Sequence, residues 1–473
     1  MAYTGFITTL KNVHKHSNAD RLQIGECFGN SVIVSLDYTE GQLGVYFPVD
    51  GQLSEEFCRV NDLVRRKDEN GNACGGYLDP EKRNIKALKL RGEKSDGLFM
   101  PLTCLADFCK ISDLKEGDTI SVLNGVEICK KYIPKRKTGT YYGGKKGGRA
   151  KANFAPTFYE HIDTAQLAYN LGEFKTGDVV ELTLKMHGTS GRTGYLPLHR
   201  HKKRTLWDKI RRRPGKEYIE YGYVTGTRRV VLDDRHDGGF YSDNQFRQEM
   251  AKKFEGKLHK GEVVYYEIVG FVNEDTPIMA SVKNSKIKDK EFTKQYGEET
   301  MFSYGCDPTG GWEPEYYDCN AGSCATLAPR CEVYVYRMTT VNEDGDVVEL
   351  SPDQVRYRCE QMGIKTVPVF EKFMIPRFEN EVQLDEQGYF VGEDTSHEIN
   401  PGEYVLRKAE QYFDGPDPIG VNHIREGVVA RIVNRPSIVV YKHKNFSFKV
   451  LEGIIKEEAI EPDMEEIQDA ASN

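Results

Sequence analysis

The feature that most constrains the fold is a change of pattern near residue 130. Residues 1–125 hold short apolar runs separated by Gly, Asp and Asn at close spacing: SVIVSL, LGVYFPV, NIKALKL and TISVL. Short runs with frequent turn signals predict a small β-barrel or sandwich. From about residue 156 the elements are longer and mixed, and residues 179–185 and 263–272 predict strands. We therefore expect two domains of different architecture.

Two segments in the second part carry helix signals. In residues 242–258, Ser242 and Gln245 form a capping box, and apolar residues recur at every fourth position, at Phe246, Met250, Phe254 and Leu258. A second helix is predicted to begin at Ser351, because Pro352 and Gln354 follow it at the positions typical of a first turn. Strands and helices alternate irregularly, which favours an α+β fold over a doubly wound sheet.

Charge is segregated along the 473 residues, whose formal net charge is −8. Residues 457–473 carry seven acids and no base, whereas residues 130–151 carry nine Lys or Arg and no acid. Residues 198–217 carry nine Lys or Arg against two acids. The net charge therefore does not exclude a nucleic-acid partner. The basic stretches are either solvated loops or contacts for a phosphate backbone, and the acidic tail is either a solvated terminus or an RNA mimic.

Cysteine content and the lack of long apolar runs bear on where in the cell the protein is found. No run approaches the roughly 18 apolar residues of a membrane span, and the first residues lack a signal-peptide layout. Eleven cysteines, most in apolar or strand-like contexts, favour a reducing, cytoplasmic location. Cys306, Cys319, Cys324 and Cys331 lack the paired spacing of common zinc sites, so a structural zinc and free cysteines remain alternatives.

A lysine at the end of a predicted strand is the sharpest chemical feature. Lys185 is followed by His187, Gly188 and two small hydroxyl residues, so the backbone there can approach a phosphate closely. A lysine amine is also a competent nucleophile when its pKa is depressed. A solvated strand end is the ordinary alternative.

Two acids and a pair of lysines lie in similar apolar settings. Glu267 is inside the run VYYEIVGFV and needs a partner, which is either a buried salt bridge or a ligand or metal. Glu426 begins the apolar run GVV. Lys442 and Lys444 project to one face of a strand, where they repel each other unless an anion lies between them. Such a pair would lower the pKa of a neighbouring lysine.

The order of these segments resembles a known signature. KMHGTS, YYEIVGF, YVYRM, EGVV and KHKNFSFK follow one another over about 185–450, as in the covalent nucleotidyltransferase superfamily of ligases and capping enzymes. His187 resembles the Lys-x-His-Gly-Thr pattern of RNA ligases, and residues 160–167 resemble a lead-in of one RNA ligase branch. Residues 16–22 and 90–98 resemble landmarks of tRNA-binding OB domains. Together they resemble a family of ATP-dependent RNA ligases with an N-terminal OB domain.

The resemblance implies an OB-like β-barrel over 1–128, a basic linker over 129–155, an ATP-grasp-like nucleotidyltransferase domain of antiparallel sheets and helices over 156–456, and an acidic tail over 457–473. It implies ATP and Mg²⁺ or Mn²⁺ as cofactors. The expected enzyme is a cytoplasmic monomer in RNA repair that joins 3′-hydroxyl and 5′-phosphate RNA ends through lysyl–AMP and RNA–adenylate. The substrate would be RNA ends, including nicked duplex RNA or an RNA/DNA hybrid.

The resemblance also implies residue roles. Lys185 would be the nucleophile, Lys442 and Lys444 would hold the α-phosphate, and Glu426 would bind the metal. The nucleotide-binding residues would be His187, Gly188, Arg228, Glu267 and Tyr336, with Arg229 and Tyr334 as near competitors for two of these roles. The alternative functions are an RNA-binding protein with an inactive nucleotidyltransferase domain, which the intact set of residues opposes, and a DNA ligase or capping-type enzyme, which His187 opposes.

Overall fold

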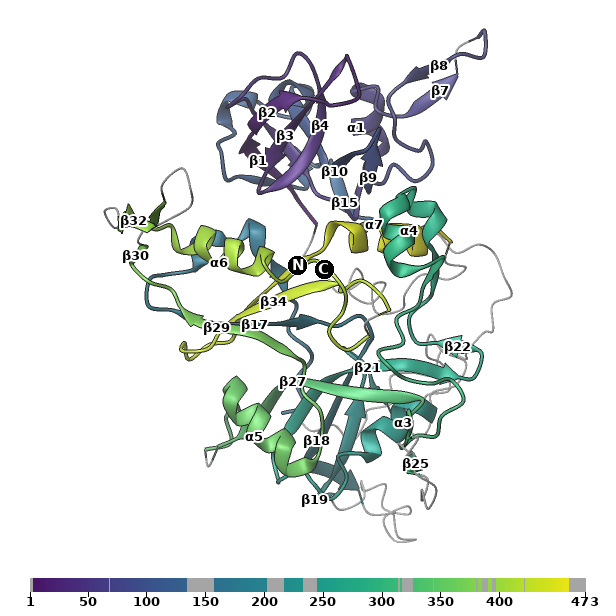
Figure 1. The fold of residues 1–473 in the computed structure, drawn as a ribbon, viewed down its shortest axis with the longest axis vertical. Helices are drawn as coiled ribbons and strands as arrows, with labels where there is room; N and C mark the ends of the chain where they lie inside the picture. Colours follow the sequence, from purple (N-terminus) through teal and green to yellow (C-terminus); the bar gives the residue numbers. More distant parts are fainter. Residues whose placement is uncertain are drawn as a thin grey trace, which may run out of the picture. The chain divides into compact units, whose positions relative to one another are not determined.

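The computed structural model divides into two compact units, one of residues Met1–Gly139 and Phe446–Asn473 and the other of Thr140–Asn445. It describes residues 3–67, 69–133, 157–201, 217–232, 245–313, 315–316, 326–342, 344–379, 382–384, 390–393, 397–420 and 422–458 (Figure 1). The predicted linker therefore falls mostly outside the described residues, as do the basic residues 202–216 and most of the predicted acidic tail.

The first unit is built from short antiparallel strands, as the spacing of turn residues predicts. One sheet has four strands in the order β11-β5-β1-β12, and another has three in the order β2-β3-β4. Their bounds are Gly5–Thr9 (β1), Lys11–Lys15 (β2), Leu22–Cys27 (β3), Asn30–Ser35 (β4), Leu43–Phe47 (β5), Leu98–Pro101 (β11) and Thr119–Ile120 (β12).

Smaller ladders, a short helix and two 3-10 turns, Leu102–Leu105 and Ile111–Asp113, make up the rest of what is described of residues 1–139. The paired strands are Gly51–Leu53 (β6) with Cys129–Lys131 (β15), Arg65–Lys67 (β7) with Ala73–Gly75 (β8), Ala87–Leu90 (β9) with Glu93–Asp96 (β10), and Val122–Leu123 (β13) with Val126–Glu127 (β14). Helix α1 spans Glu55–Val60, and its buried Phe57 joins Ile7, Val45 and Phe47 in the core. The strand pairing does not show whether these sheets close into a barrel, so the OB-like barrel stays a prediction.

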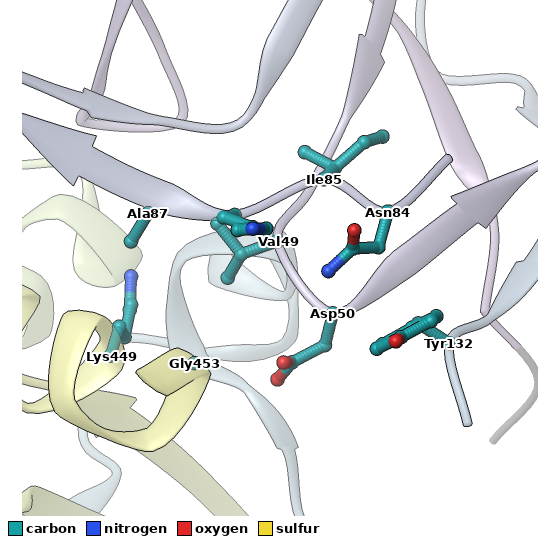
Figure 2. A pocket seen from close by; sticks show the side chains of 9 residues that line it. Val49, Asp50, Asn84, Ile85, Ala87, Tyr132, Lys449 and Gly453 are labelled. Atoms are coloured by element: carbon teal, nitrogen blue, oxygen red, sulfur yellow. The ribbon is translucent and has the colours of Figure 1, made fainter. Parts of the chain in front are cut away.

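The last helix, α7 (Phe446–Glu458), is grouped with the first unit, although the predicted nucleotidyltransferase domain runs to residue 456. Phe448 and Leu451 are both fully buried, and Nζ of Lys94 in β10 lies over the ring of Phe446, 5.4 Å from its centroid. Lys449 of this helix also donates to Asp96 at 2.5 Å. Figure 2 shows a small polar pocket beside the helix, lined by Asp50, Asn84, Tyr132 and Lys449 among others.

Two sheets form the second unit. The five-stranded sheet has the order β16-β35-β34-β17-β29, with β16 parallel to β35 and the other pairs antiparallel. Its strands are Ala165–Gln166 (β16), Val179–Lys185 (β17), Val369–Met374 (β29), Gly427–Ile432 (β34) and Val439–Lys444 (β35). The strand predicted over 179–185 is confirmed at both ends.

The larger sheet has seven strands, six of them in the order β20-β19-β18-β21-β27-β28, with β22 paired to β21. They span Thr189–His201 (β18), Glu217–Gly226 (β19), Val231–Leu232 (β20), Val263–Asn273 (β21), Thr276–Pro277 (β22), Cys331–Val341 (β27) and Val347–Glu349 (β28). β21 confirms the strand predicted over 263–272 and extends it by one residue. Its side chains alternate between two apolar clusters, with Val264, Tyr266 and Ile268 in one and Val263 and Tyr265 in the other.

The helix predictions had mixed outcomes. Helix α5 (Pro352–Met362) begins at Ser351 with a complete capping box to Gln354, as predicted. Helix α3 spans Gln245–Lys252, so the helix predicted over 242–258 was too long at its C-terminal end, and the predicted cap Ser242 lies outside the described residues. The chain continues from Lys252 in tight turns rather than helix. The predicted apolar positions Phe246, Met250, Phe254 and Leu258 are nevertheless all in the core.

The remaining elements of this unit are short. They are helices Lys290–Tyr296 (α4) and Pro401–Glu410 (α6), the 3-10 turns at Leu167–Tyr169, Leu171–Glu173 and Asn284–Ile287, and the strand pairs Val282–Lys283 (β23) with Glu299–Thr300 (β24), Glu315–Tyr316 (β25) with Thr326–Leu327 (β26), Phe378–Glu379 (β30) with His397–Glu398 (β33), and Val382–Leu384 (β31) with Phe390–Glu393 (β32). The α+β class with antiparallel sheets is thus confirmed. No helix among the described residues is long and apolar enough to cross a membrane.

Candidate active site

Three adjacent strands bring two of the predicted lysines into one row. Lys185, the last residue of β17, pairs with Gly427 of β34, and Gly427 pairs in turn with Lys444 of β35. Gly427 has φ +151°, and a Cβ added there would lie 2.1 Å from the carbonyl oxygen of His443. Only glycine can lie this close to the backbone of β35. The strands that carry Lys185 and Lys444 therefore lie on either side of Gly427.

The carboxylate of Glu426 lies between these lysines. Its Oε1 is 2.7 Å from Nζ of Lys185 and 3.2 Å from Nζ of Lys444. The Glu426 side chain is only 2% exposed. Burial by itself would raise the pKa of Glu426, but the charges of Lys185 and Lys444 outweigh it and hold that pKa well below its ordinary value. The site therefore contains a buried carboxylate that stays ionised at neutral pH.

The turn after Lys185 carries His187 and Gly188 to the same place. Nδ1 of His187 lies 3.6 Å from Oε2 of Glu426, and the backbone N–H of His187 donates to Oη of Tyr304 at 2.7 Å. A Cβ on Gly188 would lie 2.4 Å from the carbonyl oxygen of Ile268. The turn is thus packed against β21, and the glycine there is required by backbone proximity rather than by a positive φ.

Lys442 lies two residues before Lys444 and projects from the same face of β35. It pairs with Val429 in the antiparallel ladder and with Gln166 in the parallel one. The structure therefore confirms that Lys442 and Lys444 share a strand face.

Glu267 lies on β21, directly opposite Ser190 on one side and Tyr334 on the other. The register shifts between Tyr265 and Tyr266, and Tyr336 is the one extra residue of β27 at this point. Oη of Tyr336 is 2.5 Å from Nδ1 of His161. Tyr334 is thus the direct neighbour of Glu267, whereas Tyr336 belongs to a neighbouring cluster.

That neighbouring cluster is rich in arginine. Arg228 forms an ion pair with Asp163, and Arg229 reaches the same carboxylate at 3.3 Å. Arg192 is 1% exposed and lies over the ring of Phe158, 4.4 Å from its centroid.

The arginine-rich cluster surrounds one histidine, His161, and changes its pKa. Burial and the positive charges of Arg192, Arg228 and Arg337 hold the pKa of His161 well below its ordinary value, despite the opposing charge of Asp163. His161 is therefore neutral, and its Nδ1 can accept a hydrogen bond from Tyr336.

The carboxylate of Glu426 is the group in the site that suits a metal ion. Oε2 of Glu426 is buried and has no hydrogen-bond partner within the described part of the chain. A hard carboxylate oxygen suits Mg²⁺ or Mn²⁺. No group of three or more His, Cys, Asp or Glu in the described ranges, the surroundings of Glu426 included, is placed to hold a metal ion. Of the four spaced cysteines, Cys306 and Cys331 are free thiols, and Cys319 and Cys324 lie outside the described residues.

The comparison with protein families decides the class. Residues 178–451 match the model of the RNA ligase family. The chain belongs to the RNA ligase family. It is an ATP-dependent RNA ligase, an enzyme that forms phosphodiester bonds. No curated protein sequence matches the ligase.

Solved structures show the same fold at low identity. A Naegleria gruberi RNA ligase mutant with AMP and Mn is 14% identical, with a TM-score of 0.51 and coverage of 94% of this chain and 97% of that one. A mutant of that enzyme with ATP and Mn has a TM-score of 0.50, 14% identity and coverage of 97% and 100%. An apo mutant gives 0.51 at 14% identity, covering 95% and 97%. The similarity in fold therefore extends over nearly the full length of both chains.

Sequence reasoning overlooked several residues that surround the site. Phe302, Tyr304 and His423 contact His187 or each other, and His161 and Arg192 lie with Tyr336 and Arg228. His161 carried the clearest signal, because it is part of the segment EHIDTAQL. Phe302 and Tyr304 lie in a stretch without a motif, where an aromatic pair spaced by one residue was the only hint.

Proposed function

We propose that the ligase joins a 3′-hydroxyl to a 5′-phosphate end of RNA through a lysyl–AMP and an RNA–adenylate. The observation that carries this proposal is the position of Lys185 at a strand end, with a buried carboxylate at 2.7 Å and Lys444 bound to the same oxygen. Such a site concentrates a nucleophile and cations where phosphate charge would develop.

The chemistry balances in three steps. Nζ of Lys185, after losing a proton, forms a bond to the α-phosphorus of ATP, and the bond from that phosphorus to the pyrophosphate oxygen breaks. A 5′-phosphate oxygen of RNA then attacks the same phosphorus, and the phosphorus–nitrogen bond breaks as Lys185 regains a proton. Finally a 3′-hydroxyl loses its proton, attacks the 5′-phosphorus and releases AMP.

The surrounding residues would bind and orient the nucleotide. Lys442 and Lys444, on one strand face, would contact the α-phosphate oxygens. Glu267 and Arg228 would contact the ribose. Tyr336 would stack on adenine, although Tyr334 competes for this role because it lies directly opposite Glu267.

The turn at His187 and Gly188 would approach the phosphates with its backbone. Glu426 would hold Mg²⁺ or Mn²⁺ through its Oε2. When bound, the metal would neutralise negative charge on phosphate oxygens.

The proposed biological setting is RNA repair by a cytoplasmic monomer that acts on RNA ends, including nicked duplex RNA or an RNA/DNA hybrid. The membership in the RNA ligase family supports RNA as the substrate class. A sealing assay would distinguish these substrates if the 5′-phosphorylated strand and its template were each made once as RNA and once as DNA.

The decisive experiment follows transfer of label from ATP radiolabelled at the α-phosphorus to the protein. We expect wild-type protein to become labelled and Lys185→Ala to remain unlabelled. Lys372→Ala is the matched control. Lys372 lies on β29 of the same sheet as Lys185, and it also pairs with a carboxylate, that of Asp353. Labelling of Lys185→Ala would refute the assignment of the nucleophile. An unlabelled wild type would favour an RNA-binding protein with an inactive nucleotidyltransferase domain.

A further inference from the structure

A short segment that the proposed mechanism does not use contacts the turn after the nucleophile. The backbone N–H of His187 donates to Oη of Tyr304 at 2.7 Å. The imidazole of His187 also meets the ring of Phe302 edge-on, with 4.7 Å between centroids and 79° between planes. Phe302 and Tyr304 are 1% and 3% exposed. Together the two aromatic residues contact both the backbone and the side chain of His187.

The same two rings pack against a residue near Glu426. The imidazole of His423, three positions before Glu426, lies 5.1 Å from the ring of Phe302 and 4.6 Å from that of Tyr304, edge-on in both cases. His423 is fully buried. The segment therefore touches the turn that carries His187 and the loop that carries Glu426 at the same time.

That loop is itself held by local hydrogen bonds. Asp417, fully buried, accepts from the backbone N–H groups of Ile419 and Gly420, and its own N–H donates to the carbonyl oxygen of His423. A Cβ on Gly420 would lie 2.0 Å from Nε2 of His423. The imidazole is thus packed tightly on its own loop and offers Tyr304 a fixed surface.

The backbone of Tyr304 is an independent sign of constraint. Its φ is +51°, in the left-handed region that a bulky side chain rarely adopts. Such a conformation is unfavourable and persists only where the surrounding structure holds it, which is common beside functional sites. The hydrogen bond to His187 and the contact with His423 are interactions that this conformation makes available.

We propose that Tyr304 is a positioning residue for nucleotidyl transfer. By accepting the His187 N–H, it holds the turn after Lys185 at a fixed separation from Glu426, so that Nζ of Lys185 keeps its place beside the carboxylate. This inference rests on the proposed function of Lys185. It adds a residue that contacts neither nucleotide nor RNA and acts through the backbone of His187.

The test compares Tyr304→Phe with Tyr223→Phe in the full-length protein. Tyr304→Phe keeps the ring and removes the hydroxyl. Tyr223 is a matched control because its Oη also accepts a backbone N–H, that of Gly256, at 2.6 Å, in a different part of the same unit. We expect Tyr304→Phe to lower the rate of Lys185 adenylylation at saturating ATP about five- to tenfold, with KM for ATP changed less than twofold. Tyr223→Phe should leave both quantities within twofold of wild type.

Hydrogen exchange at the His187 amide gives a second measurement that does not depend on turnover. This amide should exchange faster in Tyr304→Phe and at the wild-type rate in Tyr223→Phe. An unchanged rate of adenylylation in Tyr304→Phe, or an equal loss in Tyr223→Phe, would overturn the proposal, as would unchanged exchange at His187. Failure of the proposed function would look different, because wild-type protein itself would then not be labelled by ATP.

Discussion

Two titratable groups in the second unit, the buried Glu426 and the half-buried His161, meet opposite fates. Glu426 is nearly inaccessible and remains charged, whereas His161 is held neutral. Burial disfavours the charged form of both groups, so burial cannot explain the difference. The neighbours explain it: Glu426 is flanked by the cations Lys185 and Lys444, and His161 is surrounded by arginines that would repel a proton.

The two sites should therefore respond differently to mutation. Removal of Glu426 leaves two lysines beside a buried position without their carboxylate, which is the costly way to break a buried ion pair. Removal of His161 takes away a neutral ring and one hydrogen bond to Tyr336, which is a smaller loss.

The substitution Glu426→Gln should reduce Lys185 adenylylation on the order of 100-fold or more, because it removes the negative charge beside Lys185 and replaces one carboxylate oxygen by an amide nitrogen that cannot hold a metal ion. The measurement is the initial rate of label transfer from ATP. Glu371→Gln is the control, since Glu371 accepts from Lys408 at 2.8 Å in a pair outside the site. A rate for Glu426→Gln within twofold of wild type would remove Glu426 from the mechanism.

The substitution Tyr336→Ala should raise KM for ATP about tenfold, the range expected when an aromatic platform for a base is lost. Tyr336→Phe keeps the ring and loses the hydrogen bond to His161, so its KM should stay within threefold of wild type. If Tyr334→Ala raised KM and Tyr336→Ala did not, the adenine-stacking role would pass to the residue opposite Glu267.

The neutral state of His161 predicts a pH dependence of stability. Since the folded-state pKa is lowered, the unfolded chain binds a proton below about pH 6.5 that the folded chain does not. The stability that His161 contributes is present above that pH and is lost as the pH falls, at about 1.4 kcal/mol per pH unit well below the unfolded-state pKa.

This dependence can be isolated with His161→Asn. Urea unfolding at pH 7.5, 6.5 and 5.5 should show that wild type loses more stability towards acid than His161→Asn does, by about 1 kcal/mol at pH 5.5. Parallel curves for wild type and His161→Asn would show that His161 gains its proton in the folded state as easily as in the unfolded one.

An exposed pair sets the lower limit of these effects. Arg377 and Glu398 are 66% and 67% exposed, at 3.3 Å. Arg377→Gln should change the free energy of unfolding by less than about 0.5 kcal/mol, and adenylylation should be unaffected. A larger loss would mean that partners other than Glu398 depend on Arg377.

Periodicity and capping predicted individual elements well where the signal is local. The strands ending at Lys185 and containing Glu267 were predicted to within one residue, and the helix after Ser351 began where its capping box placed it. The helix predicted through Leu258 was too long, because the same four-residue spacing of apolar side chains was satisfied by turns that pack on the sheet. Burial sets that pattern, and helix is only one way to achieve it.

The order of motifs along the chain was enough to predict an RNA ligase, since residue types at a fixed spacing report the chemistry they can perform. The same motifs single out Lys185 as the proposed nucleophile. The sequence could not show that Lys185, Gly427 and Lys444 would form one row, because that depends on the register of strands more than 200 residues apart. Nor could it show that Tyr304 accepts the His187 N–H across 117 positions. Local sequence determines which groups are available, and only long-range strand pairing and packing decide which of them meet.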